Sequence, residues 1–134
     1  MNVPESKIKE LMNQYKQICV YGLSPDSTKP SHYVPLYMKN HGWDILGIYP
    51  KMHSGSDFPI YHNLKDVPVE FRKFLNVFRS SEKIPDLVSE ILENAGIEVV
   101  WLQLGIHHDA AEKQLENAGI RVVSNRCLII EHQK

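Results

Sequence analysis

The chain has few cysteines, no excess of charge of either sign and no long hydrophobic run. Its two cysteines, Cys19 and Cys127, cannot form the disulfide framework of a small secreted domain. Lys and Arg number 15 and Asp and Glu number 16, so the net charge of −1 does not indicate a nucleic-acid partner. The N-terminal segment lacks the apolar core of a signal peptide, and no run approaches the roughly 18 residues of a membrane span. We therefore expect a cytoplasmic protein that contacts neither nucleic acid nor membrane.

Motifs of self-contained enzymes are also missing. The sequence has no Ser-His-Asp order, no H-E-x-x-H and no C-x-x-C, so it offers no visible machinery for a hydrolase or a zinc enzyme. His107 and His108 precede Asp109, but adjacent side chains do not converge on a metal ion, and we interpret them as capping and surface residues. The sequence therefore predicts no metal site and no catalytic residue, and His107 and Asp109 are the nearest candidates for chemistry.

The residues that are present predict alternating strands and helices. Of the 134 residues, 43% are hydrophobic and 23% charged, as in an ordinary globular domain. Short runs that are apolar on both faces are typical of buried parallel strands. They occupy residues 18–22, 45–49, 75–78, 99–104 and 120–123, and residues 59–62 are a candidate edge strand. Helical patterns occupy residues 4–15, 33–41, 85–94 and 108–118.

Three glycines mark the junctions between these helices and strands. The pentapeptide Glu-Asn-Ala-Gly-Ile occurs at residues 93–97 and again at 116–120, each time between a helical pattern and an apolar run. Gly42, Gly96 and Gly119 thus have the position of a residue that ends a helix through left-handed φ. We expect one domain, residues 1–134, with a leading helix within residues 1–16. Its fold should be a Rossmann-like, doubly wound α/β fold, with a mainly parallel sheet of five to six strands flanked by helices.

The loop after the first strand is the most informative stretch. An apolar run ends in Gly22, the polar residues Ser24, Thr28, Lys29 and Ser31 follow, and a helical pattern then begins. Many α/β proteins hold a phosphate with this arrangement, because the first helical turn leaves amides unpaired at the positive end of the helix dipole. The spacing matches neither the G-x-G-x-x-G pattern nor the P-loop. A polar connection that merely caps the helix is therefore an equal alternative.

Basic and amide side chains follow the other predicted strands. Lys51 follows the second strand, where an NAD-binding Rossmann domain needs an Asp or Glu for the ribose hydroxyls. A cation there favours a ribose that carries a phosphate, as in NADP or coenzyme A; the alternative is a solvated loop lysine. Arg79 could pair with Glu82 or with a phosphate. Gln103 is one amide in an apolar run, satisfied either by the backbone or by a ligand.

Five parts of the sequence, taken in order, resemble one known family. They are Gly-Leu-Ser-Pro with Lys-Pro-Ser (22–25 and 29–31), Gly-Trp-Asp-Ile-Leu-Gly-Ile-Tyr-Pro-Lys (42–51), Asn-Val-Phe-Arg (76–79), Val-Val-Trp-Leu-Gln-Leu-Gly (99–105) and Asn-Arg-Cys-Leu-Ile-Ile-Glu-His (125–132). This order resembles the small stand-alone CoA-binding proteins, which are related to the N-terminal nucleotide-binding domain of the succinyl-CoA synthetase α subunit. The resemblance extends over residues 18–132 and implies a Rossmann-like domain that holds coenzyme A, or an acyl-CoA, over the strand ends.

The resemblance also implies which residues meet the ligand. In sequence order, seven residues match the loop that meets the phosphates, and two match the segment beside the adenosine. Two more match the wall of the ligand site next to the adenine, and the last two match the far edge of that site. They are Gly22, Leu23, Ser24, Thr28, Lys29, Pro30 and Ser31, then Pro50 and Lys51, then Phe78 and Arg79, then Gln103 and Gly105. Two departures stand out. Lys29 replaces a frequent Arg and loses its bidentate fork, and residues 70–74 are charged where the family continues an apolar pattern.

We predict from this a protein that binds coenzyme A without catalysis of its own. The synthetases also need a phosphorylated histidine, a second domain and a partner subunit. Nothing in this sequence matches the setting of that histidine, and 134 residues leave no space for the second domain. The alternative is an NADP- or acyl-CoA-using enzyme whose catalytic groups come from a partner or a second subunit. A domain that has lost its ligand and acts as an interaction surface is a third interpretation. The sequence leaves open a homodimer or an unidentified protein partner.

Overall fold

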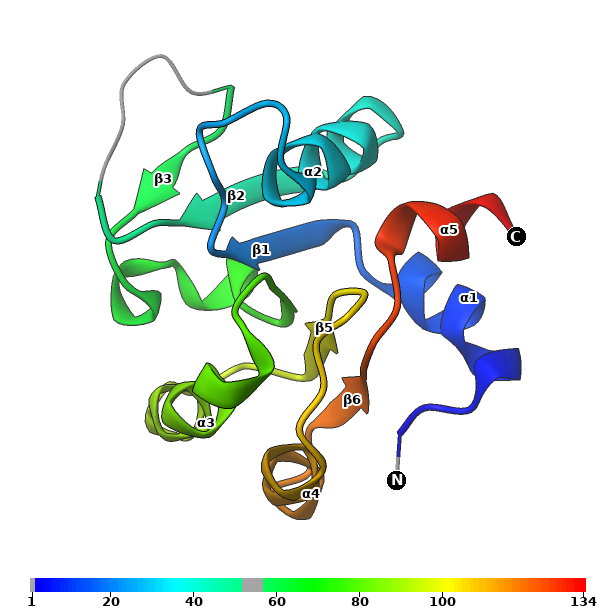
Figure 1. Ribbon diagram of the computed structural model, residues 1–134, viewed down its shortest axis with the longest axis vertical. Coiled ribbons are helices and arrows are strands. Elements are labelled where there is room, and N and C mark those ends of the chain that lie inside the picture. Colours follow the sequence, from blue (N-terminus) through cyan, green and yellow to red (C-terminus); the bar gives the residue numbers. More distant parts are fainter. Residues whose placement is uncertain (1, 52–56) are drawn as a thin grey trace.

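Six parallel strands form one sheet in the computed structural model, which describes residues 2–51 and 57–134. They are β1 (Gln17–Tyr21), β2 (Asp44–Ile48), β3 (Ile60–Tyr61), β4 (Phe74–Val77), β5 (Val99–Leu102) and β6 (Arg121–Val123). Their order in space is β3-β2-β1-β4-β5-β6 (Figure 1). The chain thus winds outward from β1 to β3, returns to β4 beside β1, and winds outward on the other side to β6. This order confirms the doubly wound, Rossmann-like fold.

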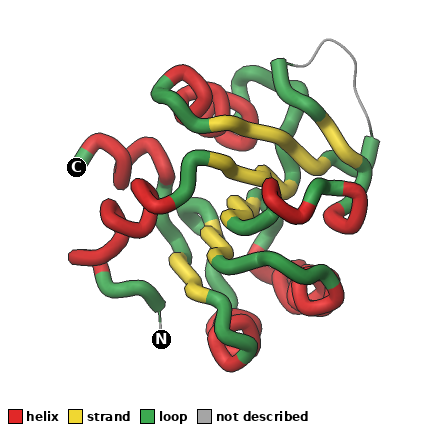
Figure 2. Tube along the Cα trace, turned by 180° about the vertical axis from the view of Figure 1, so that it is seen from behind, coloured by secondary structure: helices red, strands yellow, loops and turns green. Residues whose placement is uncertain are grey.

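Helices cover both faces of the sheet. Those in the described residues are α1 (Glu5–Gln14), α2 (Pro30–Asn40), α3 (Ile84–Glu93), α4 (Asp109–Asn117) and α5 (Leu128–Gln133). Helices α3 and α4 lie on one face, and α1, α2 and α5 on the other (Figure 1). Figure 2 shows the strands between these helices from behind. None of the helices in the described ranges is long and apolar enough to cross a membrane.

The sheet is apolar on both faces because each face is covered by helices. Successive residues of β4 point to opposite sides, so Phe74 packs with α1 and α2 whereas Leu75 packs with α3 and α4. Phe74 stacks on Trp101 of β5, with ring centroids 5.9 Å apart. Each such fully buried side chain stabilises the fold by about 1.5–3 kcal/mol. The two hydrophobic clusters thus pack against both faces of the strands.

The predicted element boundaries hold to within a few residues. The candidate edge strand is β3, and Gly42, Gly96 and Gly119 have the predicted positive φ values of 101°, 94° and 88°. The predicted helix at 33–41 is wrong at its start, because α2 begins at Pro30. Proline is tolerated at the first helical position, where its missing N–H would be unpaired anyway. Helix α5 was not predicted, because its six residues are too few to show a period.

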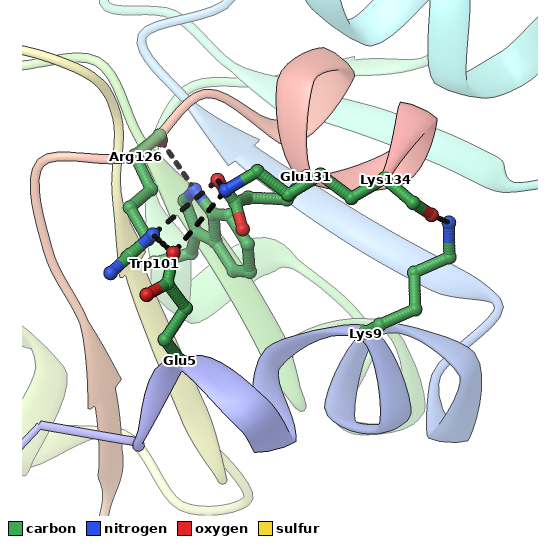
Figure 3. A network of polar contacts seen from close by, with 6 residues as sticks. All are labelled: Glu5, Lys9, Trp101, Arg126, Glu131 and Lys134. Carbon is green, nitrogen blue, oxygen red and sulfur yellow. Dashed lines mark hydrogen bonds and ion pairs between the residues drawn. The ribbon is translucent and has the colours of Figure 1, made fainter.

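Ion pairs connect α5, together with Arg126 before it and Lys134 after it, to Glu5 at the start of α1 (Figure 3). Arg126 Nη1 lies 3.5 Å from Glu131 Oε2 and 3.4 Å from Glu5 Oε1, and Lys134 Nζ lies 3.1 Å from Glu131 Oε2. The hydrogen bond from Lys134 and the charge of Arg126 hold the pKa of Glu5 below its usual value. The Trp101 indole N–H donates to the Arg126 carbonyl at 2.8 Å. The segment after β6 is thereby held across the end of β5.

Candidate ligand-binding site

A hollow opens where the carboxyl ends of β1, β2 and β4 meet. Its volume is about 410 Å³, and its lining consists of Gly22, Ser24, Lys29, Ser31, Tyr49, Pro50, Lys51, Phe78 and Arg79. A second hollow of about 310 Å³ shares part of this lining and adds Pro30, Ser80 and Ile106. Both lie where the strand order reverses, the place at which doubly wound sheets receive their ligands.

A larger hollow, of about 680 Å³, lies between α1 and the turn from α4 to β6. Its lining includes the cations Lys7 and Arg121 and the acids Glu10 and Glu116. Charges of both signs therefore surround it, and no one kind of ionic ligand is favoured. We place the candidate site at the strand carboxyl ends instead, where cations converge.

Gly22 lets the chain turn directly beside β4. Its φ is +95°, a conformation that favours glycine, and an added Cβ would lie 2.7 Å from the carbonyl oxygen of Phe78. The amides of Gly22 and Leu23 both donate to the carbonyl of Ile48 in β2, at 2.8 and 3.2 Å. The turn is therefore fixed to the strands on both sides of β1, and this forms the floor of the hollow.

Polar groups of the loop after Gly22 bond to one another and to α2. Ser24 Oγ accepts from the Asp26 amide at 3.0 Å, and Asp26 Oδ1 accepts from the amide and the hydroxyl of Thr28 at 3.0 and 2.7 Å. The bonds from Thr28 lower the pKa of Asp26. The Ser24 amide donates to the Ser31 carbonyl at 3.2 Å, and the Ser24 carbonyl lies 2.8 Å from His32 Nδ1. Because a carbonyl only accepts, His32 Nδ1 carries the proton, and these bonds connect the loop to the start of α2.

The N-terminus of α2 offers one backbone amide to a ligand. Pro30 has no N–H, and the amides of His32 and Tyr33 donate to the Lys29 carbonyl at 2.9 and 3.1 Å. Within the described residues the Ser31 amide donates to no group. The helix therefore contributes the Ser31 amide and hydroxyl, together with the positive end of its dipole.

Three cations line the 410 Å³ hollow, and the described residues of its lining include no carboxylate. They are Lys29, Lys51 and Arg79. Arg79 lies over the ring of Tyr21, with its guanidinium carbon 5.6 Å from the ring centroid, which is a cation–π distance. It forms no ion pair with Glu82 in the part of the chain that the structure describes. The Arg79 N–H groups thus remain available to an anion.

Four of the residues implied by the resemblance do not line these hollows. Leu23 is fully buried against Gly47, and Thr28 is bonded to Asp26 as described above. Gln103 is only 4% exposed, and the Gly105 amide, beyond β5, donates to Asn125 Oδ1 at 2.7 Å. Three lining residues were missed: Tyr49, Ser80 and Ile106. Each of the three follows the end of a strand by one to four residues, and the sequence offers no other sign that they line the site.

The start of α4 brings His107, Asp109 and Glu112 together, with one potential ligand atom of each within 4.8 Å of the others. The expectation that side chains do not converge here was therefore wrong. Both oxygens of Glu112 are already engaged, by Asn2 Nδ2 at 3.1 Å and by the His108 amide at 2.7 Å. His108 caps the helix through Nδ1, as predicted. These two bonds of His108 and Glu112 cap α4, and the dipole of α4 disfavours a cation at its N-terminus.

The fold and the hollow together define a class, a Rossmann-like α/β protein with a basic hollow at the switch point of its sheet. Residues 16–133 match the family described as CoA binding domain, and the chain belongs to this family. The match confirms the resemblance drawn from the five sequence segments.

Similar proteins match this chain over nearly their whole length. The protein YneT of Bacillus subtilis (strain 168) is 30% identical over 133 residues, which are 98% of this chain and 96% of YneT. The solved structure of cell-free ID.343 from Thermus thermophilus is 34% identical, with a TM-score of 0.85 and 98% of both chains covered. A hypothetical protein from Pyrococcus horikoshii OT3 is 27% identical, with a TM-score of 0.85, 98% of this chain and 91% of that chain covered.

Proposed function

We propose that this protein binds coenzyme A at the carboxyl ends of its strands and does not transform it. The observation that carries the proposal is the basic hollow at the switch point, in a chain of the CoA binding domain family. Its volume of about 410 Å³ lies within the range of small-molecule sites, which is roughly 300–1,000 Å³. Coenzyme A carries a ribose phosphate and a diphosphate, and these anions match the three cations of the lining.

The parts of the ligand have natural places in this hollow. The diphosphate lies against Gly22, Ser24 and the free amide of Ser31, at the positive end of α2. The ribose phosphate lies beside Lys51, and the adenine packs against Phe78. In this arrangement Arg79, fixed on Tyr21, faces the phosphates. Thr28 acts through Asp26 by shaping the loop, and Leu23 supports the floor from inside.

Lys51 favours coenzyme A over NAD as the ligand. A Rossmann domain that binds NAD has an acid near the end of its second strand, which accepts bonds from the ribose hydroxyls. Here Lys51 follows β2 and lines the hollow. A cation also fits the ribose phosphate of NADP, so an enzyme that uses NADP or acyl-CoA with catalytic groups from a partner is the second candidate.

Calorimetric titration with CoA, dephospho-CoA, NAD and NADP tests the binding. We expect a micromolar dissociation constant for CoA, which corresponds to roughly −8 kcal/mol, and much weaker binding of NAD. The reason is that only a ligand with a ribose phosphate engages Lys51. Clear binding of NAD with no detectable binding of CoA would refute the proposal, and tighter binding of NADP than of CoA would favour the second candidate.

Activity assays test the absence of turnover. The proposed site contains phosphate-binding and packing residues but no nucleophile beside a base among the described residues, and a base so placed is the usual requirement for covalent catalysis. Thioesterase, CoA-transferase and NADP-linked reduction assays on the pure protein should therefore stay at background. A rate that disappears in His107→Ala but survives in Lys51→Ala would make this protein an enzyme and place His107 at its centre.

A further inference from the structure

Two amide side chains are buried on the side of the sheet that helices α1, α2 and α5 cover. Asn76 in the middle of β4 is 0% exposed, and Gln103, just after β5, is 4% exposed. Asn76 lies opposite Trp101 in the strand register. A buried amide costs free energy unless its groups are hydrogen-bonded, yet none of the residues that the structure describes donates to Asn76 Oδ1. The pair therefore stabilises the fold less than two apolar residues would, which points to a role in binding.

The hydrogen bonds of this pair determine which way the Gln103 amide faces. Asn76 Nδ2 donates to the Trp101 carbonyl and to Gln103 Oε1, both at 3.4 Å. The Trp101 carbonyl can only accept, so Asn76 must turn its NH₂ group toward it. That NH₂ group can only donate, so Gln103 must turn its oxygen inward. The NH₂ group of Gln103 consequently faces the other way.

The outward-facing NH₂ group of Gln103 is an unused donor. It donates to no group in the described residues, and it is not among the enclosed polar atoms that lack a partner, so it reaches solvent. Gln103 lies at the carboxyl end of β5, and the Gln103 carbonyl accepts from the amide of Ile106, which lines the second hollow. A donor of defined orientation thus lies at the carboxyl end of β5, next to the second hollow but outside its lining.

The distance across the sheet selects the part of the ligand that reaches this donor. Lys51 follows β2 and Gln103 follows β5, and the order β2-β1-β4-β5 separates them by three strand spacings, about 14 Å at 4.8 Å each. A nucleotide held between Lys51 and Phe78 ends before that point. Its extended pantetheine arm, which carries two amide carbonyls, continues toward it.

We propose that Asn76 is a positioning residue, which orients the Gln103 amide so that its NH₂ group donates to a carbonyl oxygen of the pantetheine arm. This inference rests on the proposed function and names the part of coenzyme A that the β5 end of the site recognises. Asn76 itself does not touch the ligand. We call the two hydrogen bonds from Asn76, to the Trp101 carbonyl and to Gln103, the relay. The Trp101 carbonyl determines which way the Asn76 amide faces, and Gln103 accordingly offers a donor rather than an acceptor.

Titrations with two ligands test the relay. Coenzyme A has the arm; adenosine 3′,5′-bisphosphate lacks both the arm and the second 5′-phosphate, so its binding reports on the adenosine, the ribose phosphate and the first 5′-phosphate alone. Gln103→Met keeps the length of the side chain and removes the donor, so CoA should bind about threefold to tenfold more weakly, as for one neutral hydrogen bond. Asn76→Leu should have an effect of similar or smaller size, because it frees the Gln103 amide to rotate. The binding of adenosine 3′,5′-bisphosphate should not change in either variant.

The double variant separates positioning from a merely structural role. In the Gln103→Met background, Asn76→Leu should alter the CoA affinity by less than about twofold, because two residues that act through one contact are not additive. Gln114→Met, an exposed glutamine on α4, is the matched control and should leave both ligands unaffected. If Asn76→Leu does not fold, Asn76→Ser takes its place in the same cycle.

Three results would overturn the relay. Additive losses in the double variant would mean that Asn76 acts independently of Gln103. Equal losses for both ligands would show a general effect on the fold or on the nucleotide part of the site. If the wild-type protein binds adenosine 3′,5′-bisphosphate and CoA equally well, the arm makes no contact and only this inference fails. A wild-type protein that binds neither ligand would end the proposed function as well.

Discussion

Gly22→Ala is expected to lower the free energy of unfolding by about 2–5 kcal/mol and to abolish measurable binding of CoA. The positive φ of +95° costs an L-residue about 1–2 kcal/mol. The added Cβ would lie 2.7 Å from the Phe78 carbonyl oxygen, and relieving that overlap adds about 1–3 kcal/mol. The oxygen belongs to the backbone, so the ends of β1 and β4 must move apart, and the hollow between them changes shape. Denaturant unfolding and calorimetric titration measure the two effects.

Gly42→Ala is the matched control for Gly22→Ala. Gly42 has nearly the same φ, +101°, but no atom of residues 2–51 or 57–134 lies within 4 Å of the position that its Cβ would take. It precedes β2, at the end of that strand opposite the hollow. We expect a loss of only about 1–2 kcal/mol and an unchanged affinity for CoA. If both variants lose the same stability and Gly22→Ala still binds CoA, the contact with Phe78 does not shape the site.

Lys51→Ala is expected to weaken the binding of CoA by about 1–3 kcal/mol, a factor between about 5 and 150, and to leave dephospho-CoA almost unaffected. Lys51 is exposed and lines the hollow beside Pro50, where the proposal puts the ribose phosphate. The two ligands differ only in that phosphate. Titration of both at low and at high salt measures the effect, and the difference between them should shrink at high salt because exposed charges are screened.

Lys113→Ala controls for the loss of one positive charge. Lys113 is an exposed residue of α4, on the face of the sheet opposite α2, and its removal should change neither affinity. Equal losses of CoA and dephospho-CoA binding in Lys51→Ala would contradict the contact with the ribose phosphate. Lys51 would then attract anionic ligands without recognising a particular group.

The elements and the loop of the site could be predicted because their signals are local. Buried parallel strands are apolar on both faces, and the run that ends in Gly22 has this composition. The glycines that end helices, such as Gly42, need a positive φ that few other residues adopt. Lys51 and Arg79 stand directly after apolar runs, so their place at the carboxyl end of the sheet follows from the direction of the strands. The short α5 carried no comparable signal.

Which of these residues meet one another could not be predicted from local signals. Arg79 could have paired with Glu82, its near neighbour in sequence, but the structure places it over Tyr21 in β1. The resemblance implies that Thr28 meets the ligand, and the structure adds that its hydroxyl donates to Asp26. The sequence around Asn76 gave no sign of its hydrogen bonds, because Trp101 lies in β5 and Gln103 directly after it.

The sequence by itself determined the fold class, the stops between helices and strands, and the end of the sheet at which the candidate site lies. Hydrophobic periodicity and the positions of helix-ending glycines involve residues that are close along the chain, so the sequence alone is enough to predict their consequences. Only the tertiary structure decided that β4 lies beside β1. That adjacency creates the hollow and packs Gly22 against Phe78, and the pairing of β4 with β5 sets Asn76 opposite Trp101. Such pairings depend on how layers far apart in sequence pack together, and no local pattern specifies them.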